Sequence, residues 1–446
     1  RNCPPGTVSS FTQVRKIGAK APLLMLCVLG IIYLALQSYG CSGRSIDQLV
    51  LLQTSSSIHE EVSHSSEATL RNLASSIRVG QRREHPLTFG VLSTAGINEA
   101  AIISPVKKNP GVASITAIAS RDPARCREYT TAYGLQDARI FNSYQELLDQ
   151  SEVEAVYIPL PNGLHYEWTM KALRAGKHVL CEKPFASNAE EARAMVQLAR
   201  EKNLVLMEAF HNHYHPFAKR VHDIAQSGIV GEIRHVHARF VMNTYPFGEL
   251  IDLHTAAEIR WNQKLAGGTF MDLGSYTVEV LLDIMDRETP IVTSAQAIPW
   301  GKDPAIDKAL WANLTFPRSK VDGSVMCSFA GPESYDSSVL VSGSKGTIRA
   351  SNFNQPHQGN KILVTDLKGE VLLDEDVQAL DGATTYDLQL EAFVHNVRQV
   401  KLGQAKADQF ANTGAEPVVQ MELVDRIYKA AGMEPRTGPA NIIPKY

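Results

Sequence analysis

Residues 87–122 read LTFGVLSTAGINEAAIISPVKKNPGVASITAIASRD. Two short apolar runs, at 87–92 and 115–119, enclose a turn of small residues and a segment whose apolar residues recur at helical spacing. The separation of the two runs is that of one strand–helix–strand unit, which connects parallel strands. The stretch therefore predicts the start of a parallel sheet.

The same alternation continues along the chain. We expect further strands at 140–141, 155–158, 178–181 and 205–207, and helices at 126–133, 144–149, 164–175 and 189–202. Strands that alternate with helices are typical of a Rossmann fold, a doubly wound parallel sheet with helices on both faces. The sequence thus predicts an α/β protein whose dinucleotide-binding domain spans residues 87–207.

From residue 233 the pattern changes to long alternating runs. They lie at 235–242, 292–298, 309–316, 323–329, 338–342, 347–350 and 361–366. Such runs predict a large, mostly antiparallel sheet with one face packed on helices and the other open. We expect residues 208–446 to form an α+β substrate and dimerisation domain. Its open sheet face is where a homodimer would form.

Composition narrows the class of protein. The chain has 446 residues, of which 44% are hydrophobic and 20% charged, and this excludes a wholly disordered protein. A formal net charge of −3 argues against nucleic acid as a partner. Cys126, Cys181 and Cys327 fall in the folded body, and their odd number predicts free thiols there.

The first 86 residues differ in character from the rest. Arg15, Lys16 and Lys20 precede an apolar run from residue 21 to residue 36, which reaches residue 39 only through the polar Gln37 and Ser38. A basic flank with a short apolar core is typical of a signal peptide or an anchor, although a full membrane span needs about 20 apolar residues. We expect residues 1–41 to be a hydrophobic targeting segment and residues 42–86 a serine-rich stem. Membrane anchoring through residues 21–39, or secretion, is the favoured location; the alternative is the cytoplasm.

The turn after the first strand is where a dinucleotide pyrophosphate binds in a Rossmann sheet. The predicted contacts are Ser93, Thr94, Ala95, Gly96 and Ile97. Only Gly96 is a glycine, so an ordinary structural turn is the alternative. Ser120 and Arg121 follow the second strand and favour the 2′-phosphate of NADP over the free hydroxyl of NAD. The neighbouring Asp122 weakens this preference.

Four further segments carry recognisable motifs. They are PLPNGLH at 159–165, GKHVLCEKP at 176–184, MEAF at 207–210 and GGTFMDLGSY at 267–276. Together and in this order they resemble the glucose–fructose oxidoreductase/inositol dehydrogenase (Gfo/Idh/MocA) family. The resemblance runs from about residue 87 to a predicted final helix at 416–431, which is essentially the whole folded body.

The resemblance implies an NADP-dependent oxidoreductase with a cis peptide bond before Pro184. Tyr276 stands where inositol dehydrogenases carry histidine. This is similar to three subgroups, glucose–fructose oxidoreductase, the enzymes that oxidise D-xylose to its lactone and the dimeric dihydrodiol dehydrogenases, and the MEAF run favours the latter two. A non-catalytic NADP-binding regulator is the alternative from another class, since one fold hosts many functions. His213 is a departure, because related sequences usually carry arginine there.

The chemistry of alcohol oxidation singles out three residues. A hydride must leave the carbon while a base removes the hydroxyl proton. Tyr276 is the predicted acid/base, with Lys183 lowering its pKa and polarising the substrate oxygen. Asp272 precedes Tyr276 by four residues, so on a helix both face one site, where Asp272 orients the substrate or Lys183. Taken singly, Tyr276 could be a core residue and Asp272 a helix N-terminal charge; the Glu-Lys-Pro motif favours catalysis.

The remaining predicted contacts lie mostly on loops. For the cofactor they are Pro159, Asn162, His165, Glu182 and Lys183, and for the substrate His211, His213, Arg260 and Trp261, with packing as the alternative for the last two. On a strand, His211, His213 and His215 would share one face. With His235 and His237 they form a candidate cluster. Without carboxylate or cysteine partners, the cluster favours a hydrogen-bonded wall beside the substrate over a metal site.

Overall fold

The computed structural model describes residues 85–242, 259–330 and 335–439. The chain divides into two units, 1–84 and 85–446, and the described residues all belong to the second. The predicted targeting segment and nearly all of the predicted stem therefore lie outside the described residues. Within the described ranges, no helix is both long enough and apolar enough to cross a membrane.

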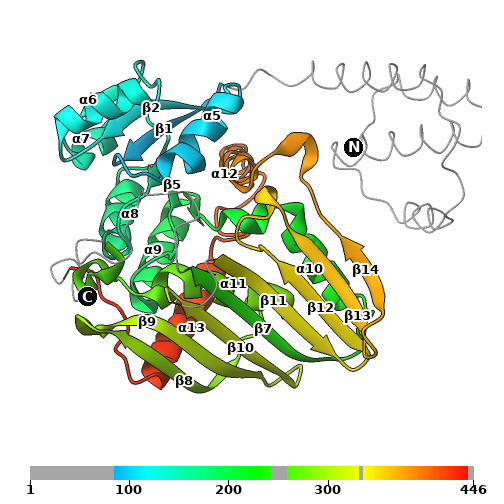
Figure 1. Cartoon of the computed structure of the whole chain (residues 1–446). Helices are drawn as coiled ribbons and strands as arrows, with labels where there is room; N and C mark the ends of the chain where they lie inside the picture. Colours follow the sequence, from blue (N-terminus) through cyan, green and yellow to red (C-terminus); the bar gives the residue numbers. More distant parts are fainter. Residues whose placement is uncertain (1–84, 243–258, 331–334, 440–446) are drawn as a thin grey trace, which may run out of the picture. The chain divides into compact units, whose positions relative to one another are not determined.

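A six-stranded parallel sheet forms the first layer (Figure 1). Its strands are β1 (Leu87–Leu92), β2 (Ala113–Ala119), β3 (Arg139–Phe141), β4 (Ala155–Ile158), β5 (His178–Cys181) and β6 (Leu206–Glu208). Their order is β3-β2-β1-β4-β5-β6, and all neighbours are parallel. The predicted Rossmann sheet is confirmed. Because the order reverses between β1 and β4, a ligand is expected beyond the carboxyl ends of the strands at that point.

Helical segments connect these strands. They are η1 (Glu99–Ile103), α5 (Ser104–Lys108), α6 (Pro123–Ala132), α7 (Tyr144–Leu148), α8 (His165–Arg174) and α9 (Ala189–Lys202). The side chains of Asp122, Ser143 and Asn188 accept hydrogen bonds from the first backbone amides of α6, α7 and α9. These caps satisfy amides that have no partner inside a helix, so the local sequence fixes where each helix begins.

The second layer is an eight-stranded sheet with the order β14-β13-β12-β11-β7-β10-β9-β8. Its strands are β7 (Ile233–Met242), β8 (Ile291–Trp300), β9 (Asp303–Phe316), β10 (Val321–Ser328), β11 (Tyr335–Gly343), β12 (Gly346–Ser351), β13 (Lys361–Asp366) and β14 (Val371–Glu375). All neighbours are antiparallel except β7 and β10. The predicted sheet is confirmed, with β14 added to it.

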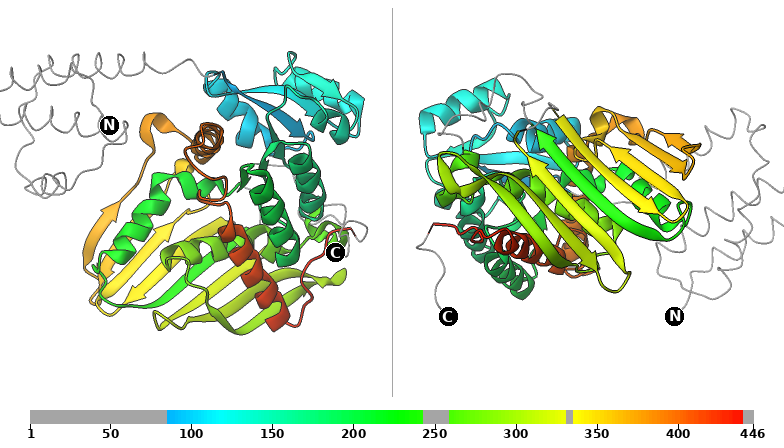
Figure 2. Two further views of the ribbon diagram at one scale, coloured as in Figure 1. Left: turned by 180° about the vertical axis from the view of Figure 1, so that it is seen from behind. Right: turned by 60° about the horizontal axis from the view of Figure 1, so that its bottom comes forward.

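One face of the second sheet carries helices and the other does not (Figure 2). Helices α10 (Pro216–Gln226), α11 (Ser275–Ile284) and α13 (Ala415–Ala430) lie on the covered face, and no helix of the described ranges lies on the other. Strand β7 shows the expected alternation: Val236, Ala238 and Phe240 are buried, whereas His237 and Arg239 between them are partly exposed. The buried cysteines Cys126, Cys181 and Cys327 are free thiols, as predicted.

Helix α12 (Thr385–Lys401) comes late in the chain but packs on the first sheet. The ring centroids of Phe393 and Phe89 of β1 lie 5.5 Å apart, and both rings are in the core on that side of the sheet. Thr384 caps the helix reciprocally with Asp387. Its first residue, Thr385, is fully buried near η3 (His211–Tyr214). A domain boundary at residues 207/208 stays a prediction, since α12 joins the first layer from beyond it.

Candidate active site

The end of β5 supplies the first part of the site. Lys183 follows this strand, and the Lys183–Pro184 peptide bond is cis, as the family resemblance implied. His165 is fully buried, with its ring nitrogens 2.8 Å from Pro184 O and 2.7 Å from Leu160 O. His165 therefore joins the loops after β4 and β5. The predicted contact of His165 with the cofactor stays a prediction.

The second part is the segment 267–276, which includes η6 (Phe270–Gly274) and the first turn of α11. Two glycines precede η6 at points of close approach. A Cβ at Gly267 would overlap a backbone carbonyl oxygen, and one at Gly268, whose φ is 136°, would overlap a buried carboxylate. Any larger residue would displace the segment, so its path depends on both glycines.

These two parts bring Lys183, Asp272 and Tyr276 together. The Lys183 ammonium lies 2.6 Å from Asp272 Oδ1 and 3.2 Å from the Asp272 carbonyl oxygen. It also lies over the Tyr276 ring, 4.9 Å from the centroid. The other carboxylate oxygen of Asp272 accepts a hydrogen bond from Arg260 Nε at 2.5 Å. Arg260, predicted to contact the substrate, is thus the second cation on Asp272.

The protonation states follow from these contacts. Burial alone would raise the pKa of Asp272, but the charges of Arg260 and Lys183 hold it well below its ordinary value. Burial raises the pKa of Tyr276 well above its ordinary value of 10.0. The predicted lowering by Lys183 is therefore wrong, because the ammonium is paired with Asp272 and contacts the ring rather than the hydroxyl. Tyr276 is protonated, and its hydroxyl oxygen lies 3.1 Å from His211 Nε2, within hydrogen-bond distance.

A buried ion pair anchors the segment 267–276. Asp307 of β9 accepts hydrogen bonds from the Phe270 amide at 2.6 Å, the Tyr428 hydroxyl at 2.9 Å and Arg436 at 2.6 Å. Arg436 also donates to Gly267 O at 2.7 Å. Asp307 and Arg436 side chains are 0% and 2% exposed. The pair fixes the segment against the second sheet, and no sequence motif pointed to it.

Asp307→Asn should destabilise the protein, because Arg436 would keep its charge without a counter-ion. Breaking a buried ion pair on one side costs about 3–5 kcal/mol, and we expect a value near the lower end because asparagine retains some hydrogen bonds. Urea unfolding measures the loss. The control is Asp322→Asn, at an exposed position of β10, which should change stability by at most about 0.5 kcal/mol. Equal stabilities of the two variants would contradict the anchoring role.

The backbone of the turn after β1 has a conformation that a ligand can approach closely. Ser93 has a φ of 144°, in a region that favours glycine. Its hydroxyl accepts from the Ala95 amide at 3.2 Å, and its carbonyl oxygen accepts from Asn98 Nδ2 at 2.9 Å, so the turn is held in this conformation. A Cβ at Gly96 would meet nothing within 4 Å. The space beside Gly96 is therefore open, which suits a pyrophosphate.

The end of β2 bears on the choice between NAD and NADP. Asp122 Oδ1 accepts from the amides of Ala124 at 2.9 Å and Arg125 at 3.2 Å, so this carboxylate caps α6. The Ser120 hydroxyl accepts from the Asp122 amide at 3.2 Å, and Arg121 is exposed. One carboxylate oxygen of Asp122 is thus used by the helix, while Arg121 beside it can donate to a 2′-phosphate.

Two of the other predicted cofactor contacts, Asn162 and Glu182, make hydrogen bonds within the protein, and their contact with the cofactor stays a prediction. Asn162 Nδ2 donates to Ala266 O at 3.1 Å and so joins the loop after β4 to the residue that precedes the segment 267–276. Glu182 is buried and accepts from the Tyr157 hydroxyl at 2.6 Å. Thr94 and Pro159 are buried, whereas Ile97 is 36% exposed. Trp261 is also buried, stacked on Trp300 with ring centroids 5.0 Å apart, which supports the packing alternative.

The five histidines do not form one cluster. Residues 211–214 form a 3₁₀ helix rather than a strand, so alternate residues point in different directions and the predicted shared face is wrong. The partners are Tyr276 for His211, Asp283 for His213, the Phe217 amide for His215, and Ser324 for both His235 and His237. Among these five, His211 is the one bonded to Tyr276.

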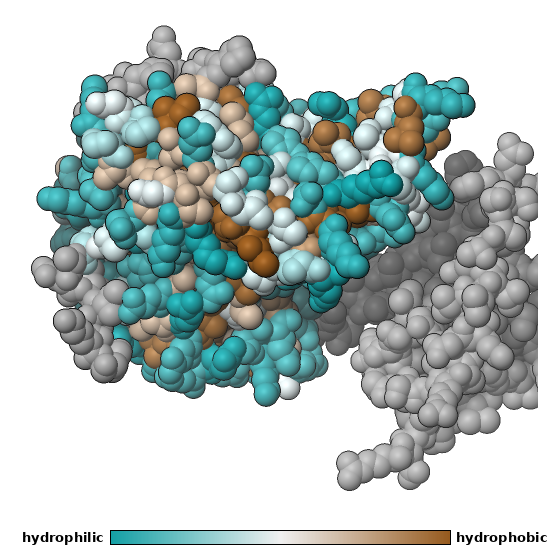
Figure 3. Space-filling model, turned by 90° about the horizontal axis from the view of Figure 1, so that it is seen from below, coloured by the Kyte–Doolittle hydropathy of each residue, from teal (hydrophilic) through white to brown (hydrophobic). Residues whose placement is uncertain are grey.

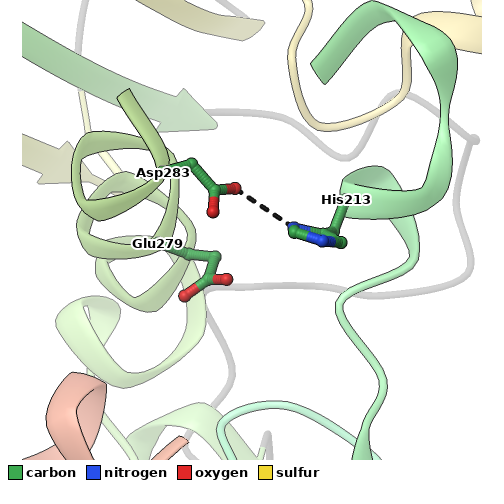
Figure 4. Close-up of side chains that lie close together, drawn as sticks. All are labelled: His213, Glu279 and Asp283. Carbon is green, nitrogen blue, oxygen red and sulfur yellow. Dashed lines mark hydrogen bonds and ion pairs between the residues drawn. The ribbon is translucent and has the colours of Figure 1, made fainter. Parts of the chain in front are cut away.

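His213 instead belongs to a separate charged group with Glu279 and Asp283 of α11 (Figure 4). Histidine and carboxylates are ligand types that bind metal ions. Arg287, however, donates to Glu279 at 2.6 and 2.9 Å and also to Asp283. Burial opposes charge on His213, but its bond to Asp283 raises its pKa. Arg287 thus already pairs with both acidic side chains, and we propose no metal ion there.

Comparison with known proteins supports the fold and the motifs. Residues 87–210 match a family model described as an oxidoreductase family with an NAD-binding Rossmann fold. Residues 218–349 match the GFO/IDH/MocA C-terminal domain. The D-xylose 1-dehydrogenase (NADP(+)) 2 of Haloferax volcanii is 32% identical over 350 residues, which cover 77% of this chain and 97% of that protein.

Two further relatives differ in the reaction that they are named for. The trans-1,2-dihydrobenzene-1,2-diol dehydrogenase of Macaca fascicularis is 30% identical, covering 60% of this chain and 75% of its own. The crystal structure of a 3-ketoreductase from Actinomadura kijaniata in complex with NADP and TDP-benzene is 25% identical, with a TM-score of 0.65. It covers 78% of this chain and 98% of that one.

The fold and these matches define an oxidoreductase with a dinucleotide-binding Rossmann domain. Within that class, the chain belongs to the Gfo/Idh/MocA family.

Proposed function

We propose that this protein is an NADP-dependent dehydrogenase that oxidises a sugar, an aldose such as D-xylose, to its lactone. The observation that carries the proposal is the convergence of Lys183, Asp272 and Tyr276. Alcohol oxidation needs both a proton acceptor and a cation near one oxygen atom. A protein that only bound NADP as a regulator would need neither. The relative from Haloferax volcanii, named for D-xylose and NADP, supports the choice of substrate class.

Each residue of the site has a separate role in the proposed reaction. NADP supplies the hydride acceptor at its nicotinamide ring. The Lys183 ammonium polarises the substrate oxygen, and Asp272 holds that ammonium in place at 2.6 Å. Tyr276 exchanges a proton with the same oxygen. Because Tyr276 is protonated, it can take the substrate proton only while its own proton passes to His211 Nε2. The reverse transfer would serve ketone reduction.

The residues at the ends of β1 and β2 fit NADP. The turn of Ser93–Gly96 leaves open space for a pyrophosphate. Ser120 and Arg121 would hold the 2′-phosphate, because a guanidinium and a hydroxyl both donate hydrogen bonds to phosphate oxygens.

Arg121→Ala should raise the KM for NADP by roughly tenfold or more, because a hydrogen bond to a charged group contributes about 1.5–3 kcal/mol. The KM for NAD should change little, since NAD lacks the 2′-phosphate. Initial rates with both cofactors measure the effect. Arg127→Ala, on the exposed side of α6, is the control and should alter neither constant. An equal change for NADP and NAD would contradict the assignment of Arg121.

A substrate panel tests the proposed function. NADPH absorbance is followed with D-xylose, other aldoses, trans-dihydrodiols and, in the reverse direction, keto sugars. Turnover of an aldose supports the proposal. Turnover of dihydrodiols alone would support the second candidate, a trans-dihydrodiol dehydrogenase, which the 30% identical relative favours. Binding of NADPH without turnover of any compound would favour the regulator.

We also propose that the chain forms a homodimer through the open face of the second sheet. Exposed apolar side chains lie on its edge strands, at Ile291 and Ile298 of β8 and Val371 and Leu372 of β14. Seen from below, apolar residues occur in groups among polar ones (Figure 3). Sedimentation equilibrium measures the mass, and a monomer at micromolar concentration would contradict the proposal.

The location of the protein stays a proposal based on residues 1–41. Their basic flank and apolar core favour a targeting segment or an anchor. Expression of the chain with and without residues 1–41, followed by membrane fractionation, tests this role.

A further inference from the structure

The hydroxyl of Tyr276 begins a chain of hydrogen bonds that continues beyond Lys183 and Asp272. Tyr276 Oη lies 3.1 Å from His211 Nε2, and His211 Nδ1 lies 2.8 Å from Thr385 Oγ1. Thr385 Oγ1 in turn lies 3.2 Å from His357 Nδ1. The four side chains come from α11, η3, α12 and η7 (Pro356–Gln358). Four separate elements therefore meet to form one continuous chain.

Every hydrogen bond of this chain can be donated in the same direction, from Tyr276 towards His357. Burial lowers the pKa of His211 well below its ordinary value and also lowers the pKa of His357, so both rings are neutral near pH 7. A neutral imidazole has one donor and one acceptor nitrogen. Tyr276 then donates to His211 Nε2, His211 Nδ1 donates to Thr385, and Thr385 donates to His357 Nδ1.

The chain runs from a desolvated group to one that reaches the surface. Tyr276, His211 and Thr385 are 5%, 2% and 0% exposed, whereas His357 is partly exposed. The charged or titratable groups near His357 are Lys108, Asp387, Tyr386, His211 and His215. The side chain of His357 can therefore exchange protons with water, which the buried Tyr276 cannot do directly.

The middle of the chain is held rigidly. Thr385 is the first residue of α12, and the reciprocal cap of Thr384 and Asp387 fixes that end of the helix. The His211 ring stacks on Tyr386, with centroids 4.1 Å apart and planes 29° apart. Both neighbours restrict the rotation of the relay side chains, so the hydrogen bonds are preorganised.

We propose that His211, Thr385 and His357 form a proton relay between Tyr276 and solvent. The relay rests on the proposed function, since oxidation of an alcohol by NADP releases one proton per turnover. The substrate proton passes to Tyr276 Oη as the phenol proton passes to His211 Nε2. The Nδ1 proton of His211 passes to Thr385, the hydroxyl proton of Thr385 passes to His357 Nδ1, and the Nε2 proton of His357 leaves to water. The hydride carries the bonding electron pair to NADP, so charge and atoms balance.

Thr385→Val removes the central hydroxyl with little change in shape. We expect kcat to fall by roughly tenfold or more, since positioned proton transfer contributes about 10²–10⁴-fold to rates. The solvent deuterium isotope effect on kcat should rise, and the KM values and NADPH affinity should stay within about threefold. Thr385→Ser, which keeps a hydroxyl, should restore most of the lost rate. The matched control is Thr130→Val, which removes a buried hydroxyl of α6 that donates to Arg127 O at 3.0 Å and should leave kcat unchanged.

His357→Ala tests the outer end of the relay without touching His211 or Tyr276. Its kcat should fall, and added imidazole should restore it, because a soluble base can replace a side chain near the surface. Thr385→Val should not respond to imidazole. Wild-type kcat in both variants, with a normal solvent isotope effect, would overturn the relay while leaving the proposed function intact. A wild-type protein that turned over no compound of the substrate panel would instead overturn the proposed function, and the relay with it.

Discussion

Tyr276→Phe should lower kcat by roughly 10²–10⁴-fold, the range that positioned acid–base groups contribute. The phenol is the group within hydrogen-bond distance of His211, and phenylalanine keeps the ring that packs against Phe210 and Phe240. Folding and NADPH affinity should therefore remain close to those of the wild type. Stopped-flow measurement of NADPH formation separates the chemical step from product release.

The control for Tyr276→Phe is Tyr214→Phe. The Tyr214 side chain is partly buried and its hydroxyl donates to Ala411 O at 3.3 Å, but it lies outside the convergence of Lys183, Asp272 and Tyr276. Its loss should cost stability with little change in kcat. Wild-type turnover by Tyr276→Phe would contradict the acid–base role, whatever the effect of Tyr214→Phe.

Lys183→Met should lower kcat by about 10³-fold or more, because the preorganised charge at the substrate oxygen disappears. Methionine keeps the length and the apolar stem of the side chain. Asp272 would keep Arg260 as its partner, so the carboxylate would not be left unpaired. Steady-state kinetics measure the loss, and calorimetry checks that the variant is folded.

The control for Lys183→Met removes a lysine charge that lies outside the site. Lys171 pairs with Glu167 at 2.6 Å on the surface of α8, and Lys171→Met should leave kcat unchanged. If Lys183→Met retained most of its activity, the ammonium would not be the group that polarises the substrate.

Local sequence was sufficient to predict the first sheet. Each strand–helix unit buries its own apolar residues, so periodicity alone identifies its elements, as in residues 87–122. Periodicity could not predict that α12 packs on that sheet. Nothing in an amphipathic pattern such as that of Leu390 and Phe393 says which of two sheets it covers, and the choice depends on contacts between residues about 300 positions apart in the sequence.

In the candidate site, too, the sequence motifs predicted some features, whereas others depend on how the chain folds. Motifs placed Lys183 beside Asp272 and Tyr276, because each lies at a fixed position in a recognisable segment. The protonation of Tyr276 was predicted wrongly, since burial and the pairing of Lys183 with Asp272 are properties of the fold. The alternation at 211–215 suggested a strand, but a 3₁₀ turn directs His211 alone to the phenol.

Thr385 and His357 carried no sequence signal at all. They lie 174 and 146 positions from His211, in segments without a motif, and only the packing of α12 brings them together.

A structure of the protein with NADP and an unreactive sugar analogue tests the catalytic centre most directly. The proposed mechanism predicts that the hydroxyl oxygen of the analogue lies within about 2.6–3.2 Å of both Tyr276 Oη and Lys183 Nζ, with its carbon facing the nicotinamide ring. A nicotinamide bound away from the end of β5, or an analogue that contacts neither side chain, would contradict it.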